Sequence, residues 1–523
     1  LRYITALNLY FIVRKYIKQD KSKINLIANV IAIMSVITII FGIDMICGNN
    51  FTSIYEFIKV PESTAISVER MSSIFKYANT FCIYIGISLF VTMAAYLNIK
   101  NNNDNENESE NENKNKGSKL YRLDKIKKSL YANAIFMQIF AIGATFSRLG
   151  WIIIFALLLF YTFYFKENRK EIVKVLVITG INAFIYFCIF YKKASENTNY
   201  IIWLMLVLQN IIQFLIFYKW DGIKELLNKI LKLDKLTKKI DTNKDNSKRV
   251  FLIITVILCI LIAIIYICMP NDLVLFDSSN AQKTYRKQNI VVSGDTEYTF
   301  SFDIKALRQK PTVFKIYIKE LDNNEIELKQ TEIQIREMDG ILPYTIKTQK
   351  NTTNITLLFK CSKPTENTKL TVKSVKLNDK EIKVNYKFIP INLINRIEKL
   401  KVNTASGNTR EEYIKYSFEL IKQSPIFGLG GYAWRCSNMD SFELKTVAEH
   451  CYPLQLFMQN GIISILAYIG IIVILIIRFV NILKNKQKDI YLISFYMIAF
   501  LILIHSLLDF DMYFQIILLY LFM

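Results

Sequence analysis

Long blocks of apolar residues with few or no charges constrain this chain more than any other feature. A helix of about 20 apolar residues is what a hydrocarbon layer about 30 Å thick requires. Nine blocks have this character: 24–47, 77–99, 129–146, 149–165, 172–191, 200–218, 250–269, 454–479 and 489–507. We therefore predict a mostly α-helical, polytopic membrane bundle. This prediction excludes a soluble enzyme, a disordered chain and a secreted disulfide scaffold.

The distribution of basic residues predicts how the bundle is oriented. Lys and Arg gather in every second connection, with ten in 219–249 and none in 508–511. Short basic loops stay on the cytoplasmic side, so the long connection 270–452 is predicted to lie outside the cytoplasmic membrane. The formal net charge of +22 follows from these basic loops, and we expect the lipid bilayer and no nucleic acid as a partner.

The blocks and the segments between them predict four regions. Residues 1–270 form a membrane helical region with a low-complexity insert, 101–117, that is predicted to be disordered and cytoplasmic. Residues 277–389 form a β-sandwich, 390–452 an outer loop with amphipathic helices, and 453–523 the C-terminal membrane helices. The apolar ends 1–13 and 512–523 are too short to cross, so we expect both to be cut spans of a longer protein.

Residues 277–389 show short runs of the kind that form strands. The runs are 288–292, 298–304, 313–321, 344–348, 355–359, 370–377 and 382–386, with turns at 322–324 and 378–379. Many short alternating strands separated by turns are typical of a β-sandwich. After it, a capping box at 409–412 predicts a helix that runs to Gln423.

The chain has two histidines, and the predicted topology brings both to the outer face. His450 ends the outer loop just before Pro453, and His505 stands near the outer end of the last block, ahead of Asp509 and Asp511. Histidine can act as a base because its unperturbed pKa is about 6.5.

Three arginines are predicted at the same membrane level. Arg70 precedes the second block, Arg148 lies in the short break between two blocks, and Arg410 lies in the predicted first turn of the helix after the sandwich. A charge at the edge of the hydrocarbon is costly, so we expect Arg148 to have a partner. Guanidinium groups bind phosphate oxygens in a bidentate way, which favours a lipid-linked phosphate donor.

Four segments share their residue types and order with a known family. They are Arg70-Met-Ser-Ser-Ile-Phe-Lys-Tyr-Ala-Asn79-Thr, Thr145-Phe-Ser-Arg148-Leu-Gly, Pro425-Ile-Phe-Gly-Leu-Gly430 followed by His450, and His505-Ser-Leu-Leu-Asp509-Phe-Asp511. Together they resemble the O-antigen ligase and O-antigen polymerase (Wzy-like) family. Two positions depart from the family pattern: Cys451 stands where Asn usually follows the His, and Leu149 stands where Gly usually follows the Arg.

The resemblance implies a membrane glycosyltransferase of the GT-C type that works on the outer side of the cytoplasmic membrane. Such an enzyme moves a glycan from undecaprenyl pyrophosphate to an acceptor hydroxyl on a glycan, lipid or protein. It inverts the anomeric centre and needs no metal or cofactor. The segment 277–389 resembles the carbohydrate-binding jelly-roll modules that are inserted in some members.

The resemblance also implies roles for particular residues. His450 would be the base, while Arg148, Arg410 and, more weakly, Arg70 would bind the pyrophosphate. His505 and Asp509 would orient the base, and Asn79 would support the same site. Gly428 and Gly430 would allow a tight turn beside the substrate.

Two other interpretations remain open at this point. Asp509-Phe510-Asp511 is a DxD pattern, which would suit a metal-dependent membrane glycosyltransferase. A polysaccharide flippase or transporter with an outer recognition domain is the second alternative.

Overall fold

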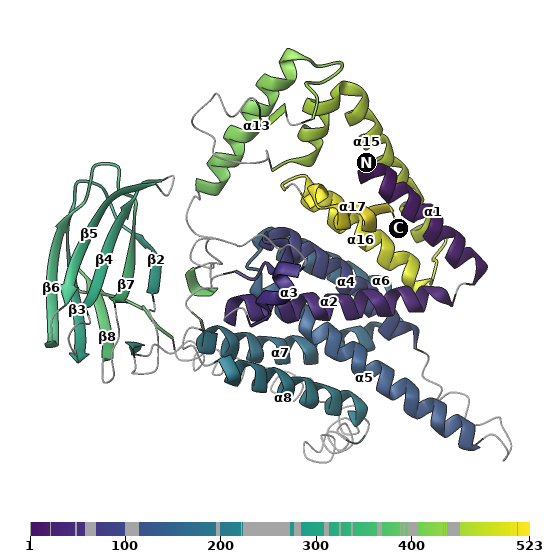
Figure 1. The fold of residues 1–523 in the computed structure, drawn as a ribbon, viewed down its shortest axis with the longest axis horizontal. Helices are drawn as coiled ribbons and strands as arrows, with labels where there is room; N and C mark the ends of the chain where they lie inside the picture. Colours follow the sequence, from purple (N-terminus) through teal and green to yellow (C-terminus); the bar gives the residue numbers. More distant parts are fainter. Residues whose placement is uncertain are drawn as a thin grey trace, which may run out of the picture. The chain divides into compact units, whose positions relative to one another are not determined.

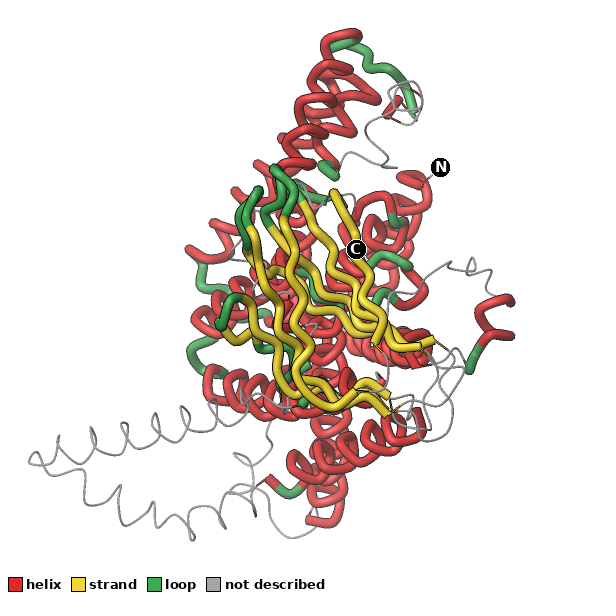
Figure 2. The backbone as a smooth tube through the Cα atoms, turned by 90° about the vertical axis from the view of Figure 1, so that its left-hand side faces the viewer, coloured by secondary structure: helices red, strands yellow, loops and turns green. Residues whose placement is uncertain are grey.

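In the computed structural model the chain is mostly helical and divides into two compact units. A helical unit comprises 1–187, 204–220 and 409–523, and a β unit comprises 188–203 and 221–408. Figures 1 and 2 show their helices and strands. The structure describes residues 2–20, 22–47, 50–57, 70–99, 114–194, 199–220, 222, 272–276, 284–307, 313–323, 326–335, 338–362, 369–386, 389–390, 393–395, 405–431, 433–434, 436, 450–509 and 511–522.

Most of the helices follow the apolar blocks. They are α1 (Arg2–Gln19), α2 (Lys23–Cys47), α3 (Thr52–Phe57), α4 (Ala78–Asn98), α5 (Lys114–Ala144), α6 (Arg148–Tyr164), α7 (Arg169–Ala194), α8 (Asn199–Tyr218), α13 (Ala405–Gln423), α15 (Tyr452–Lys484), α16 (Ile490–Ser506) and α17 (Gln515–Phe522), with 3₁₀ turns η1 (Ser73–Phe75) and η3 (Asp511–Tyr513).

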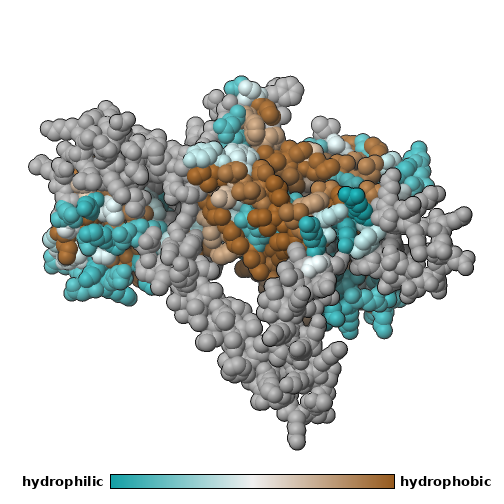
Figure 3. All heavy atoms as spheres, turned by 90° about the horizontal axis from the view of Figure 1, so that it is seen from below, coloured by the Kyte–Doolittle hydropathy of each residue, from teal (hydrophilic) through white to brown (hydrophobic). Residues whose placement is uncertain are grey.

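Five helices are long and apolar enough to cross a membrane: α2, α4, α7, α8 and α15. Helices α6 and α16 are shorter apolar helices at positions where the sequence predicts spans, and α5 contains most of the block 129–146. Figure 3 shows a broad apolar surface on the face seen from below. Large exposed apolar side chains such as Val177, Ile181, Val207 and Ile211 line α7 and α8, as expected for helices that face lipid. These helices support a multi-pass membrane protein. The predicted span 250–269 lies outside the described residues.

Helix α4 is buried along nearly its whole length, with α2, α5 and α16 packed against it. Buried polar side chains join these helices. Gln138 on α5 donates to Ser35 Oγ on α2 and to Thr92 Oγ1 on α4, both at 2.9 Å. Interhelical hydrogen bonds of this kind stabilise packing in a bilayer. Thus α4 is the central element whose N-terminus positions the candidate site.

The β unit contains two antiparallel sheets. Their orders are β1-β8-β3-β6, with β9 on β8, and β2-β7-β4-β5. The strands are β1 (Leu273–Phe276), β2 (Thr284–Val291), β3 (Glu297–Leu307), β4 (Val313–Leu321), β5 (Glu327–Ile335), β6 (Met338–Lys347), β7 (Asn354–Ser362), β8 (Lys369–Leu377) and β9 (Lys380–Ile382). Both sheets bury alternate residues in one shared core, where the rings of Phe302 and Phe359 lie 6.5 Å apart.

Most predicted strand runs coincide with strands, but two strands were not predicted. β1 is an apolar run of four residues that pairs with β8 and lies before the predicted boundary at 277. β5 carries mostly polar, exposed side chains at the edge of its sheet, so apolar alternation could not reveal it. The run 382–386 contributes only the end of β9 and a bridge at Tyr386. The predicted turn at Asn378 and Asp379 is confirmed: both have positive φ, 45° and 65°, as in a two-residue hairpin.

Two helix starts differ from the sequence-based expectation. Helix α13 ends at Gln423 as predicted, but it begins at Ala405 rather than at the capping box 409–412. Residues 114–117 of the predicted disordered insert form the first turn of α5, while 101–113 lie outside the described residues. In each case the helix extends into a polar sequence that carries no apolar periodicity.

Candidate active site

Three segments that are distant in sequence meet at one end of the helical unit around the carboxylate of Asp509. This side chain is fully buried and follows α16. Its Oδ1 accepts a hydrogen bond from Tyr77 Oη at 2.8 Å, and its Oδ2 accepts one from Asn79 Nδ2 at 2.7 Å. The Nδ1 of His450 lies 3.4 Å from Asp509 Oδ1. The topology therefore places a carboxylate beside the predicted base.

His450 is held where it can contact both this carboxylate and solvent. Its side chain is 21% exposed, whereas that of Asp509 is 0% exposed. Its ring stacks on Tyr413 at 5.8 Å with an interplanar angle of 14°, and Tyr77 lies 6.5 Å away. The backbone of His450 has a φ of 56°, which non-glycine residues adopt rarely and often at functional sites. Pro453 lies in the first turn of α15.

A small apolar cluster fixes the position of Tyr413. The ring of Tyr413 on α13 lies 5.8 Å from that of Trp434, and Trp434 is buried with Leu420, Ile421 and Met458. This cluster joins α13, the segment 429–434 and α15. The aromatic wall against His450 is thus supported by packing rather than by a single loop.

Arg70 reaches the same site but is tied to the protein. Its Nε donates to the carbonyl of Thr145 at 2.8 Å, and its Nη2 donates to Asn79 Oδ1 at 2.6 Å. The same loop is anchored by Met71 N, which donates to the Ala144 carbonyl at 2.9 Å. Arg70, Asn79 and Asp509 therefore form one hydrogen-bonded chain that links the turn after α5 to the carboxylate beside His450.

His505 pairs with Asp511 in the segment that follows α16. Its Nδ1 pairs with Asp511 Oδ2, and both side chains are fully buried. Asp511 also accepts a hydrogen bond from Thr80 Oγ1 at 2.7 Å. Asp509 lies 3.4 Å from His450, whereas the expected role of His505 in orienting the base stays a prediction.

The DxD carboxylates are directed to separate sets of protein partners. Asp509 accepts from Tyr77 and Asn79, and Asp511 accepts from Thr80. Within the ranges that the structure describes, no group of three His, Cys, Asp or Glu side chains could hold a metal ion.

Arg148 is the first residue of α6 and is half-buried. The protein partner expected for it is not found: its guanidinium makes no hydrogen bond or ion pair with any residue in the described part of the chain. Its donors remain available for an anion. Arg410 lies in the second turn of α13 rather than the first, and its side chain is outside the described set.

Gly428 and Gly430 form the predicted tight turn, with φ of 75° and 86°. The turn lies against α15 where that helix kinks at Gly461, whose φ is 72°. A Cβ on Gly428 would lie 2.5 Å from the backbone N of Asn460. Leu429 N donates to the Met458 carbonyl at 2.8 Å, and Gly430 N donates to the Gln459 carbonyl at 3.0 Å. The glycines thus allow close backbone contact with the kinked helix.

Three residues of the site were not selected from the sequence: Tyr77, Thr80 and Tyr413. Tyr77 and Thr80 flank Asn79 in the segment that begins at Arg70, so their presence in that segment was the available signal. Tyr413 carried no signal, because an aromatic residue on an amphipathic helix usually serves packing.

The site combines a partly exposed imidazole, a buried carboxylate against it, and the guanidinium of Arg70 bonded to Asn79. An imidazole paired with a carboxylate in this way can accept a proton from a bound group. Comparison with protein-family models, curated proteins and solved structures found no match to this chain.

Proposed function

We propose that this chain transfers a glycan from an undecaprenyl-pyrophosphate-linked donor to an acceptor hydroxyl on the outer face of the cytoplasmic membrane, as a polysaccharide polymerase or ligase of the O-antigen ligase and polymerase type. The observation that carries this proposal is the partly exposed ring of His450 against the buried carboxylate of Asp509. The four resembling sequence segments support the choice of reaction.

In the proposed reaction Asp509 accepts a hydrogen bond from the Nδ1–H of His450, and the proton stays on Nδ1. This leaves the Nε2 lone pair to take a proton, as in other carboxylate–imidazole pairs. The acceptor hydroxyl loses its proton to His450 while its oxygen bonds to the anomeric carbon. The bond from that carbon to the pyrophosphate oxygen breaks, and undecaprenyl pyrophosphate leaves with the electron pair. Attack opposite the leaving group inverts the anomeric centre.

Arg148 is the strongest candidate to neutralise the leaving group, with Arg410 as a second. Stabilisation of developing charge by prepositioned donors is commonly the largest contribution to catalysis. The guanidinium of Arg70 already donates to Thr145 and Asn79, so we assign it mainly to positioning Asn79. No metal ion is needed in this scheme.

For the β unit we propose a jelly-roll fold that recognises the acceptor or the product. The strand orders 1-8-3-6 and 2-7-4-5 support this fold, because a jelly roll consists of two four-stranded sheets in Greek-key connection. Deletion of the sheets should raise the KM for the acceptor more than it lowers kcat. A deletion that lowers only kcat would instead favour a spacer.

The proposed base is tested by transfer assays with purified protein and a lipid-pyrophosphate donor. His450→Ala and His450→Gln should each lose at least about 100-fold in rate, because a positioned base contributes about 10²–10⁴-fold. His505→Ala should retain measurable transfer, with thermal unfolding used to correct for lost folded protein. An active His450→Ala beside an inactive His505→Ala would show that the base is misassigned. Loss of wild-type transfer in EDTA, restored by a divalent cation, would favour the metal-dependent alternative.

A further inference from the structure

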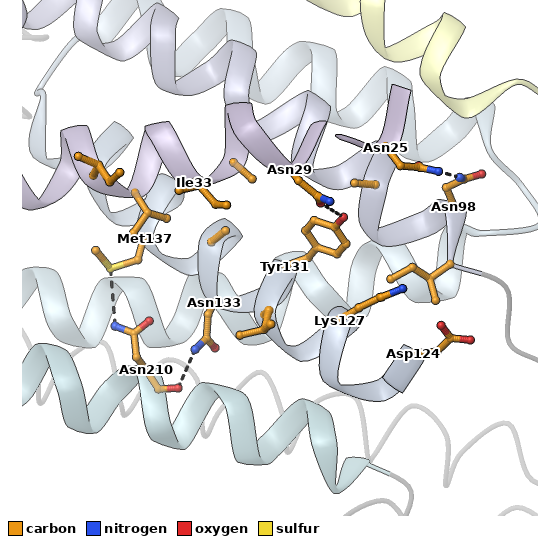
Figure 4. A pocket seen from close by; sticks show the side chains of 17 residues that line it. Asn25, Asn29, Ile33, Asn98, Asp124, Lys127, Tyr131, Asn133, Met137 and Asn210 are labelled. Atoms are coloured by element: carbon orange, nitrogen blue, oxygen red, sulfur yellow. Dashed lines mark hydrogen bonds between the residues drawn. The ribbon is translucent and has the colours of Figure 1, made fainter. Parts of the chain in front are cut away.

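A pocket of about 770 Å³ lies between α2, α4, α5 and α8 (Figure 4). It is at the opposite end of the helical unit from Asp509, because α4 carries Asn79 at the candidate active site and Asn98 at the pocket. Asn98 comes 19 residues after Asn79, which corresponds to about 28 Å at 1.5 Å per residue. This is close to the hydrocarbon thickness of a bilayer. The pocket therefore lies at the other edge of the membrane.

The pocket has an apolar wall and a fixed polar mouth. Ile33, Val36, Ile37 and Met137 line its apolar part. At the mouth, Tyr131 Oη donates to Asn29 Oδ1, and Asn25 Oδ1 accepts from Tyr491 Oη at 2.6 Å and from Asn98 Nδ2 at 3.3 Å. These bonds join α2, α4, α5 and α16, so the mouth is built by several helices. An apolar wall beneath a polar mouth, at a membrane edge, fits an amphipathic ligand such as a lipid.

One cation and one anion stand at this mouth. Asp124 and Lys127 both line the pocket, and residues three apart lie on the same side of a helix. Figure 4 shows both extending from α5 at the same end of the pocket. Neither forms a salt bridge with the other or with another residue among those the structure describes, although Asp124 acts electrostatically on Lys128. Both charges are therefore available to a ligand.

We propose that this pocket binds an aminophospholipid. Its phosphate contacts Lys127, its ammonium contacts Asp124, and its chain lies along the apolar wall. A purely anionic headgroup fits less well, because Asp124 would repel it. A quaternary ammonium fits less well too, because it has no N–H to donate to the carboxylate, whereas a primary ammonium has three.

The test uses the full-length protein in detergent and native mass spectrometry with three lipids of the same chains: phosphatidylethanolamine, phosphatidylglycerol and phosphatidylcholine. We expect phosphatidylethanolamine to be retained most strongly. Lys127→Met should weaken its retention about tenfold, as for loss of a hydrogen bond to a charged group. Asp124→Asn should abolish the preference over phosphatidylglycerol. Arg122→Met, on the same helix, exposed and outside the pocket, is the matched control and should change nothing.

Two outcomes would overturn the proposal. A preference for phosphatidylglycerol that Asp124→Asn leaves unchanged would mean that the pocket takes an anionic lipid. Equal retention of all three lipids by wild type, Lys127→Met and Arg122→Met would mean that bound lipid is not held here. Because the readout is lipid retention, neither outcome depends on whether the chain transfers glycans.

Discussion

Asp509→Asn changes one atom of the carboxylate on which the proposed mechanism depends. In the structure both oxygens act as acceptors: Oδ1 lies 2.8 Å from Tyr77 Oη and 3.4 Å from His450 Nδ1, and Oδ2 lies 2.7 Å from Asn79 Nδ2. An amide has one acceptor oxygen and one NH₂ donor. If the NH₂ group of the amide takes the place of Oδ2, it faces the donor Nδ2 of Asn79. If it takes the place of Oδ1, it faces the Nδ1–H of His450.

The expected loss follows from these contacts. If the amide cannot accept from Nδ1–H, His450 no longer presents Nε2 as the proton acceptor, and the contribution of the base, about 10²–10⁴-fold, is withdrawn. This equals about 2.7–5.4 kcal/mol of barrier. We expect kcat to fall at least about 100-fold while the KM for the lipid-linked donor changes little, because the proposed pyrophosphate contacts are elsewhere.

Asp511→Asn is the matched control, since the same change is made two residues away. Asp511 pairs with the fully buried His505, and breaking a buried pair costs about 3–5 kcal/mol of stability. Its main effect should therefore be a lower thermal midpoint in detergent, with a smaller loss of rate per folded molecule. If Asp509→Asn retains transfer within about threefold of wild type while His450→Ala is inactive, the carboxylate does not orient the base.

Three further predictions use other parts of the molecule. Gly461→Ala should lower the thermal midpoint, because a Cβ there would lie 1.9 Å from a carbonyl oxygen and the backbone φ is 72°. The control Gly470→Ala lies in the same helix, where a Cβ meets no atom within 4 Å, so it should be neutral or stabilising. Equal midpoints for the two variants would contradict this prediction. Arg148→Lys should lose most transfer, since a point charge replaces a bidentate fork, and full activity would remove Arg148 from the phosphate site. In a cysteine-free background, a Cys that replaces Asp379 in a turn of the β unit should react with an impermeant thiol reagent in intact cells. A Cys that replaces Lys488 should react only after the cells are lysed. The reverse pattern would invert the proposed orientation.

The parts of the fold that could be predicted are those governed by short-range patterning. Apolar blocks predicted α4 and α15 because a helix long enough to cross a bilayer requires continuous apolar sequence. The edge strand β5 was missed because its exposed face and partial burial leave too little alternation. For the site, the segments containing His450, Asn79 and Asp509 were identified, but the pairing of each histidine was not. That choice depends on how the chain turns after α16, where Asp509 accepts from Asn79 and Asp511 accepts from Thr80 of the same helix, and no local pattern encodes it.

The kink of α15 also bears on the order in which the protein can be assembled. A break in a helix leaves carbonyls without amide partners, and in a bilayer each such group is costly. Here the carbonyls of Met458 and Gln459 accept hydrogen bonds from Leu429 and Gly430, which precede α15 in the chain and leave the ribosome first. The backbone partners of the kink are therefore already synthesised when α15 enters the membrane. A protein divided after Gly430 and co-expressed as two pieces would have to bring these partners together by diffusion, so its C-terminal piece should insert α15 stably only when the N-terminal piece is present.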